Sequence, residues 1–328
     1  MAESTKPGTA CARWLSRPGP LLGLLFVVVI FAVLCPPQFS TFYNAKTVIT
    51  QTVIIGIGAL GMTVIMISGG IDLSPGSQIA LCSVVVAIVL KAAGAEMAPI
   101  VPLLAALAGI AACAACGLVN GLITAKLRIV PFIVTLGMMQ IARGLAKWLA
   151  SEQTVIAPAN WLNNLMLVDP EPAWLIFAPG VWVAIILLVL LSVILQFTVF
   201  GRYVFAIGSN EMTARLCGIR VGLQKVWIYT LCSVFVGISG VMQYANLTVG
   251  DPTAAGGMEL DIIASVVIGG GSLSGGEGSA LGSLIGALIM AVLRNGCNML
   301  GVPNYVQDII IGVIIVAAVA VDRLRHRG

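Results

Sequence analysis

The sequence predicts an all-α integral membrane protein, a polytopic helical bundle of about ten transmembrane helices. Hydrophobic residues make up 59% of the 328 positions, and charged residues only 9%. Such a chain lacks the polar side chains needed to cover a water-soluble globule. A spanning helix needs roughly 20 apolar residues, and apolar runs near that length recur along the whole chain. We therefore expect one transmembrane domain over residues 1–328 and no soluble domain.

The candidate spans are ten apolar runs. In chain order they are 21–35, 47–67, 76–93, 100–125, 130–150, 176–200, 226–246, 260–270, 279–298 and 305–321. The eighth is short and either crosses the bilayer or only dips into it. The first follows a basic start, as a secretory signal does, but Phe31, Val33 and Leu34 provide no small-residue cleavage site, so we expect a retained first span.

The distribution of Lys and Arg predicts the orientation. Three basic residues precede the first run and three follow the last, and such residues accumulate on the cytoplasmic side. Both termini are therefore predicted to be cytoplasmic, with tails at 1–20 and 322–328 and an even number of spans. Counting passes places Lys126, Arg128, Arg202, Arg215, Arg220 and Lys225 inside. It places Glu152, Asp169, Glu171, Asp251 and Glu259 outside.

Small residues recur every four positions in two of the runs, where they allow close helix packing. The two ladders are Gly109, Cys113, Gly117 and Gly121, and Gly278, Gly282 and Gly286. We expect packing within the chain, with a subunit interface as the alternative. Residues 117–137 and 286–312 also share a pattern of Gly-led helix, basic residue, Val-Pro and apolar helix, which indicates a diverged repeat of the kind found in transporters.

No catalytic or metal-binding constellation is visible in the sequence. The single histidine, His326, lies in the basic tail, which leaves no Ser-His or Cys-His pair within the spans. Cys113 and Cys116 form an isolated CxxC among alanines, and we expect them to pack as small hydrophobes. The sequence therefore predicts no cofactor, no metal, no enzymatic activity and no nucleic-acid binding.

A Gly- and Pro-rich interruption with an acidic residue lies between the second and third runs. Within SGGIDLSPGS (68–77), Gly70, Pro75 and Gly76 surround Asp72 and Ser74. A carboxylate at membrane depth requires water, a partner or a break in the helix. One interpretation is a non-helical hinge on the transport route. The other is a cytoplasmic turn in which Asp72 and Ser74 act as ordinary helix caps.

Two further segments are candidates for the transport route. Glu259 and Asp261 border the eighth run after a Gly-rich stretch, where they either cap its outer end or line an entrance for a polar solute. The sequence LSGGE (273–277) matches a signature of ATPase subunits, but the chain contains no Gly-Lys pair and hence no phosphate-binding loop. We therefore expect a flexible turn between two spans there, and no ATP binding.

Residues 201–222 form a polar, basic interruption that we predict to be cytoplasmic. Ser209 or Asn210 can cap a short helix with Glu211 in its first turn and Arg215 in its last, and Gly218 then permits a left-handed exit. Such a rod suits a lever that fits a groove on a motor subunit. The alternative is a helix that rests on anionic membrane lipid.

Four motifs in order resemble the ribose-type sugar permeases of ABC importers. They are GGIDLSPGS, NG with VPFIVTLG (120–137), GRYVFAIGSNEMTARLCGI and ELDIIASVVIGGGSLSGGEGSALGSLIGAL, and the resemblance spans about residues 56–321. It implies a permease subunit of the bacterial inner membrane. Its implied partners are ABC ATPase subunits, a periplasmic substrate-binding protein, a second permease copy or homologue, and a small sugar.

The resemblance places the coupling loop for the ATPase at 201–219, with Ala206, Gly208, Asn210, Ala214, Arg215 and Gly218 at positions of the family pattern; Glu211, which pairs with Arg215, completes the coupling candidates. The candidates for the translocation path or hinge are Gly70, Asp72, Ser74, Pro75, Gly76, Asn120, Glu259 and Asp261. Pro75 and Ser209 depart from the usual Val and Gly of the family. A permease for a branched-chain amino acid or another small polar solute is the alternative, and an ion-driven transporter or a membrane scaffold has less support.

Overall fold

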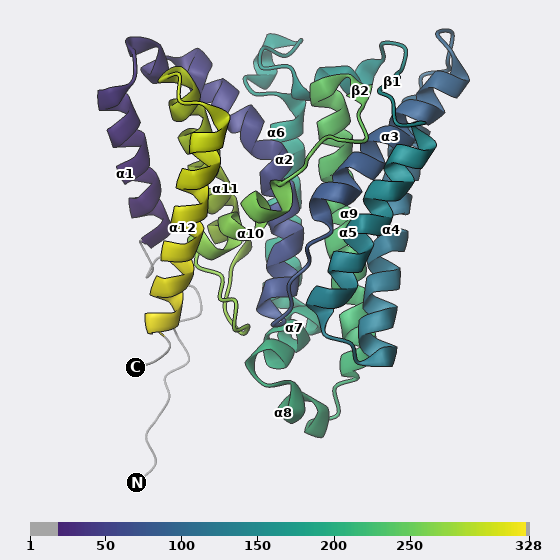
Figure 1. The fold of residues 1–328 in the computed structure, drawn as a ribbon, viewed down its shortest axis with the longest axis vertical. Coiled ribbons are helices and arrows are strands. Elements are labelled where there is room, and N and C mark those ends of the chain that lie inside the picture. The colour runs from purple at the N-terminus through teal and green to yellow at the C-terminus, as the bar shows by residue number, and fades with distance from the viewer. Residues whose placement is uncertain (1–18, 326–328) are drawn as a thin grey trace.

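The computed structural model describes residues 19–325, which form a bundle of helices (Figure 1). The α-helices are α1 (Gly19–Leu34), α2 (Phe42–Ile67), α3 (Pro75–Ala93), α4 (Val101–Leu127), α5 (Pro131–Leu149), α6 (Pro179–Phe197), α7 (Val199–Ser209), α8 (Glu211–Leu216), α9 (Val221–Leu247), α10 (Met258–Ile268), α11 (Ala280–Met299) and α12 (Asn304–Arg325). Short 3-10 helices lie at Pro37–Ser40, Trp161–Met166 and Ala173–Leu175. Two short strands, β1 (Val155–Ile156) and β2 (Val249–Gly250), pair antiparallel, a detail that the all-α prediction lacked.

Each of the ten predicted runs contains one helix, which confirms a helical membrane bundle. Six helices in the described chain are long and apolar enough to cross a membrane, namely α2, α3, α4, α6, α9 and α11. At 11 residues, α10 is only about 16 Å long and cannot span a bilayer alone. The total of ten spans therefore stays a prediction.

Proline and short polar side chains explain where several helices begin. Pro75, Pro131 and Pro179 each occupy the first position of a helix. Proline suits this position because its fixed φ is helical and its missing N–H would have no partner there. Ser279 and Thr198 each accept a hydrogen bond from the backbone three residues on, at the starts of α11 and α7. The boundaries thus follow from local sequence.

The helix α9 lies at the centre of the bundle, where it packs against α2, α3 and α4. The first glycine ladder makes this possible. A Cβ at Gly109 would lie 2.6 Å from the Cys82 sulfur of α3, and one at Gly121 would lie 2.6 Å from the Val226 Cα of α9. The ladder therefore packs within the chain, as predicted. In the second ladder Gly282 and Gly286 face the backbone of the α10 region, but Gly278 precedes α11 and is not on the helical stripe.

Two non-helical segments interrupt the middle of the bundle. Residues 68–74 return from the end of α2 to the start of α3, and residues 251–257 lead from β2 to α10. In Figure 1 both α3 and α10 begin at mid-height, after non-helical segments that approach from opposite ends. We call these the first break (68–74) and the second break (251–257). Backbone of this kind is tolerated at membrane depth only where protein or water surrounds it.

The predicted repeat corresponds to two helical hairpins that point in opposite directions. The turn between α4 and α5 lies at the end of the bundle that carries α8, whereas the turn between α11 and α12 lies at the other end (Figure 1). Each hairpin follows one of the two breaks. This arrangement is typical of inverted-topology repeats in transporters.

Basic side chains concentrate at the α8 end. The α4–α5 turn carries Arg128, the α7–α8 region carries Arg215 and Arg220, and α12 also ends there (Figure 1). This segregation supports the predicted orientation. The helix α12 continues to Arg325, so the first residues of the predicted tail at 322–328 are helical. Of the tail at 1–20, residues 1–18 lie outside the described part of the chain, as do 326–328.

Candidate functional site: a coupling segment joined to a buried break

The predicted coupling segment folds into two short helices. Asn210 ends α7 and caps α8, because its side-chain oxygen accepts a hydrogen bond from the Thr213 N–H at 2.9 Å. The chain leaves α8 at Gly218, whose φ of 85° is left-handed. The capped helix is confirmed, with Asn210 rather than Ser209 as the cap. The sequence did not predict that the preceding residues form α7.

The charges of α8 tie it to α9. Glu211 accepts from Arg215 at 2.7 Å and from Lys225 of α9 at 2.8 Å. Partial burial alone would raise the pKa of the Glu211 carboxyl, but the hydrogen bonds and charges of Lys225 and Arg215 outweigh it and lower that pKa. Glu211 is therefore held ionised between two cations. Sequence spacing indicated the ion pair between Glu211 and Arg215 but not the one between Glu211 and Lys225.

A small apolar cluster holds α8 on α7 and α9. Ala214 is buried against Ile207 and Val221, and Ala206 packs against the same cluster. Two of the predicted coupling residues are thus packing residues. The other apolar side chains of α8, Met212 and Leu216, are exposed.

Gly208 lies where α7 meets the rest of the bundle. A Cβ at Gly208 would overlap the carbonyl oxygen of Ile67 and lie 2.6 Å from the backbone nitrogen of Gly276. The Gly276 N–H in turn donates to the Ile67 carbonyl at 2.8 Å. The LSGGE turn is therefore packed against the end of α2 and is hydrogen-bonded to it. Since Ile67 immediately precedes the first break, Gly208 connects the coupling segment to that break.

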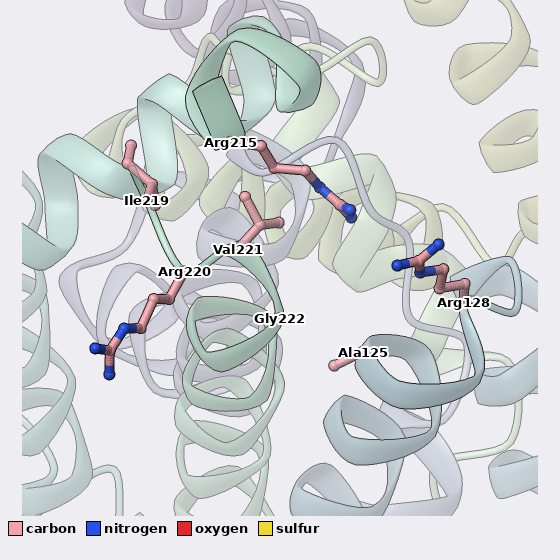
Figure 2. A pocket seen from close by; sticks show the side chains of 7 residues that line it. All are labelled: Ala125, Arg128, Arg215, Ile219, Arg220, Val221 and Gly222. Carbon is pink, nitrogen blue, oxygen red and sulfur yellow. The ribbon is translucent and has the colours of Figure 1, made fainter. Parts of the chain in front are cut away.

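An open pocket of about 420 Å³ lies beside α8, between the end of α4 and the start of α9. Its lining comprises Ala125, Arg128, Arg215, Ile219, Arg220, Val221 and Gly222. Figure 2 shows the side chains of Arg128 and Arg215 directed toward one another, and that of Arg220 directed away. The pocket is basic, and it adjoins the surface on which α8 is exposed.

The first break is closed around Asp72. Asp72 and Ser74 are both 0% exposed, which rules out a solvated cytoplasmic turn. One carboxylate oxygen, Asp72 Oδ1, accepts from the backbone N–H of Ser74 at 2.7 Å and from its hydroxyl at 2.5 Å. Pro75 and Gly76 then begin α3. Asp72 thus stabilises the turn before α3 and lines no open cavity in this conformation.

Polar side chains from α3, α4 and α9 surround the first break. Asn120 of α4 approaches the Ser74 hydroxyl at 3.4 Å, and Gln78 of α3 donates to it at 2.7 Å. A Cβ at Gly70 would lie 2.7 Å from the hydroxyl of Tyr229 of α9. The predicted residues Gly70, Asp72, Ser74 and Asn120 therefore come together in one buried cluster.

The second break meets the first at the start of α3. Glu259, in the first turn of α10, lies directly against Gly76, and its Oε2 is buried without a hydrogen-bond partner. Neither Glu259 nor Asp261 makes a capping hydrogen bond for α10. Instead, the nearly buried Asp261 pairs with Arg294 of α11 at 2.7 Å. The sequence left a cap at the outer end of α10 and the lining of an entrance as alternatives. The ion pair holds Asp261 inside the bundle, where it makes no cap, and the entrance stays a prediction.

One helix, α5, contacts both breaks. Thr135 donates to the Ile71 carbonyl at 3.4 Å, and Arg143 donates to the carbonyls of Pro252 and Ala254 at 2.9 and 2.7 Å. Sequence patterns did not indicate Arg143, Gln78, Tyr229 or Arg294 as functional residues. An ionisable residue inside an apolar run is itself a signal for function, and that signal would have found the two arginines.

Two central breaks, inverted hairpins and a charged helical extension at one end are features of a multi-span membrane transport subunit. The chain belongs to the family described as "Branched-chain amino acid transport system / permease component", whose model matches residues 44–319. This match covers most of the chain and both breaks.

Relatives from Escherichia coli (strain K12) confirm the resemblance to sugar permeases. The Ribose import permease protein RbsC is 38% identical over 321 residues, which is 95% of this chain and 95% of the relative. The Probable ABC transporter permease protein YphD is 35% identical, over 95% of this chain and 92% of the relative. The L-arabinose transport system permease protein AraH is 35% identical, over 93% of this chain and 91% of the relative. No solved structure matches the chain.

Proposed function

We propose that this chain is the permease of an ATP-driven ABC importer that moves a monosaccharide across the bacterial inner membrane. Its similarity to ribose and L-arabinose permeases over more than nine-tenths of its length carries this proposal. The chain crosses the membrane about ten times, with both termini and α8 in the cytoplasm. The basic α8 end supports this orientation.

The energy for transport comes from separate ATPase subunits that bind α8. The chain has no phosphate-binding loop of its own. The exposed Met212 and Leu216 provide an apolar surface on α8, and Arg128 and Arg215 add a basic pocket beside it. Together they form a contact surface for a partner with an apolar groove and an acidic rim. A periplasmic binding protein delivers the sugar on the opposite side, and a second permease copy or homologue completes the pathway.

Movement of α8 reaches the first break by two routes. One passes through α7 and Gly208 to Ile67, the last residue of α2. The other passes through the Glu211–Lys225 ion pair to α9, on which Tyr229 lies one turn further along and contacts Gly70. Both routes end at backbone that is not helical and is therefore free to bend. The Gly76–Glu259 contact then carries the movement to the second break.

A sugar is the substrate class that the relatives favour, whereas the description of the family names branched-chain amino acids. Uptake of radiolabelled ribose, L-arabinose and leucine by a deletion strain, with and without the restored gene, separates these two. We expect restoration of a pentose signal and no change for leucine. Restored leucine uptake with unchanged sugar uptake would establish the amino-acid alternative.

Docking at α8 can be tested with a native cysteine. Cys217 directly follows α8 and is exposed, whereas the other cysteines of the described chain are buried or half-buried. We expect a maleimide to label Cys217 in the permease alone and the ATPase to protect it, with Cys217→Ser as the labelling background. Equal labelling with and without bound ATPase would contradict docking at α8.

An exchange of charges tests the coupling role. The variant Glu211→Arg/Arg215→Glu keeps a pair within α8 but places an arginine beside Lys225. We expect normal membrane insertion and loss of uptake. Normal uptake by this double variant would refute the coupling role of α8.

A further inference from the structure

The buried cluster at the first break is organised around one hydroxyl. Ser74 Oγ donates to Asp72 Oδ1 at 2.5 Å and accepts from Gln78 Nε2 at 2.7 Å and from Asn120 Nδ2 at 3.4 Å. All four side chains are 0% exposed. They come from the break itself, from α3 and from α4, so this hydroxyl joins three parts of the bundle.

Proton balance fixes how the two amides are oriented. A serine hydroxyl has one proton, and an ionised carboxylate can only accept. The Ser74 proton therefore goes to Asp72, and both amides must present their NH₂ groups to the hydroxyl oxygen. The amide oxygens of Gln78 and Asn120 are thereby turned away from it, whichever way each amide is first assigned.

Three oxygen acceptors in this cluster consequently have no donor. Asp72 Oδ2, Gln78 Oε1 and Asn120 Oδ1 are all buried without a hydrogen-bond partner. Each belongs to the carboxylate or amide group whose other polar atom is hydrogen-bonded to Ser74 Oγ. The Tyr229 hydroxyl, which abuts Gly70, is also unpartnered. In the described chain no Lys or Arg forms an ion pair with Asp72. A buried carboxylate without a counter-charge is strongly destabilising.

We propose that the first break holds a monovalent cation of the sodium class, bound by Asp72 Oδ2, Gln78 Oε1, Asn120 Oδ1 and the Tyr229 hydroxyl oxygen. All four ligands are hard oxygen atoms, and the single carboxylate balances one positive charge. A water molecule would donate to two of the acceptors but leave the charge unbalanced. A proton on Oδ2 would also balance the charge, and together with the Tyr229 hydroxyl it would provide one donor for each amide oxygen. Dependence on sodium at fixed pH separates that protonated state from a bound cation.

The cation would fix the break to its neighbours. Its ligands come from the break, α3, α4 and α9, so it joins the non-helical backbone to three packed helices. This role goes beyond the transport function proposed above and does not depend on it, because the ion stabilises the folded permease whether or not a partner is bound.

Sodium binding to the purified full-length permease tests the proposal directly. We expect saturable binding of radiolabelled sodium, one ion per chain, in detergent. We also expect the unfolding temperature to rise by several degrees when sodium replaces N-methyl-D-glucamine at constant ionic strength, because a ligand that binds only the folded state stabilises it. No binding, or an unfolding temperature that follows pH and ignores sodium, would overturn the proposal.

Two matched variants locate the ion. Asp72→Asn keeps an oxygen for the turn at Ser74 and removes the charge, so we expect it to abolish sodium binding. Asp251 provides the control, since its Oδ1 accepts from the Thr253 N–H and hydroxyl, both at 2.7 Å, in the same kind of turn at an exposed position. Asp251→Asn should bind sodium as the wild type does. Equal sodium binding by Asp72→Asn and the wild type would also overturn the proposal, as would unchanged affinity in Asn120→Ala.

Discussion

Replacement of Gly208 by alanine perturbs the contact between the coupling segment and the first break. Gly208 lies within α7, where alanine would normally favour the helix by up to about 1 kcal/mol. The added methyl group, however, overlaps the Ile67 carbonyl and lies 2.6 Å from the Gly276 nitrogen. Both are backbone atoms and cannot rotate away, so we place the overpacking near the upper end of the usual range, about 3 kcal/mol.

The expected net loss for Gly208→Ala is therefore about 2 kcal/mol of unfolding free energy. Thermal unfolding of the purified permease measures it, and ATP-driven uptake into proteoliposomes with both partners measures its effect on coupling. We expect a lower unfolding temperature and loss of most uptake, because α7 must move away from the end of α2.

Gly312→Ala is the matched control for this change. Gly312 lies within α12, and a Cβ added there meets nothing within 4 Å. We expect Gly312→Ala to unfold at or above the wild-type temperature with normal uptake. Wild-type uptake and stability in Gly208→Ala would refute the argument that Gly208 transmits movement through a close backbone contact.

Three further predictions concern charged side chains. Asp72→Asn is expected to lower uptake without lowering the amount of protein in the membrane, and unchanged uptake would reduce Asp72 to a turn-forming residue. The lowered pKa of Glu211 predicts a contribution to stability that is present above its unfolded pKa of about 4.3 and lost as pH falls through the folded pKa. Because the Glu211 side chain is 39% exposed, we expect it to contribute less than about 1 kcal/mol to the free energy of unfolding. The unfolding temperatures of wild type and Glu211→Gln should therefore differ slightly at pH 7 and converge near pH 3. A difference that stays constant with pH would contradict this. Arg294→Met should lower the free energy of unfolding by up to about 3 kcal/mol, because it leaves the carboxylate of Asp261 buried and unpaired. Adding Asp261→Asn to this variant should restore part of the lost unfolding temperature. An unfolding temperature that does not recover would contradict the pairing.

Local rules were sufficient to predict α8 and the first break. A capping Asn210, an i,i+4 pair and a left-handed Gly218 define a short helix from neighbouring residues alone. Likewise, Gly and Pro around Asp72 predicted that the helix would be interrupted there. In both places the energy that decides the structure comes from residues close in sequence.

Contacts between distant residues could not be predicted in this way. Arg294 and Asp261 are 33 positions apart, and Gly208 meets the end of α2 only because the bundle folds. Sequence patterns offered Asp261 as a helix cap or as part of an entrance, because it borders a short apolar run. The ion pair that buries it depends on the packing of α10 against α11, which sequence spacing does not contain.

Reconstitution tests the central claim, that this permease is driven through α8 by a separate ATPase. The purified permease in liposomes should accumulate no sugar with ATP alone, and should accumulate it when the ATPase and the binding protein are both added. Sustained uphill uptake by the permease alone would contradict the account.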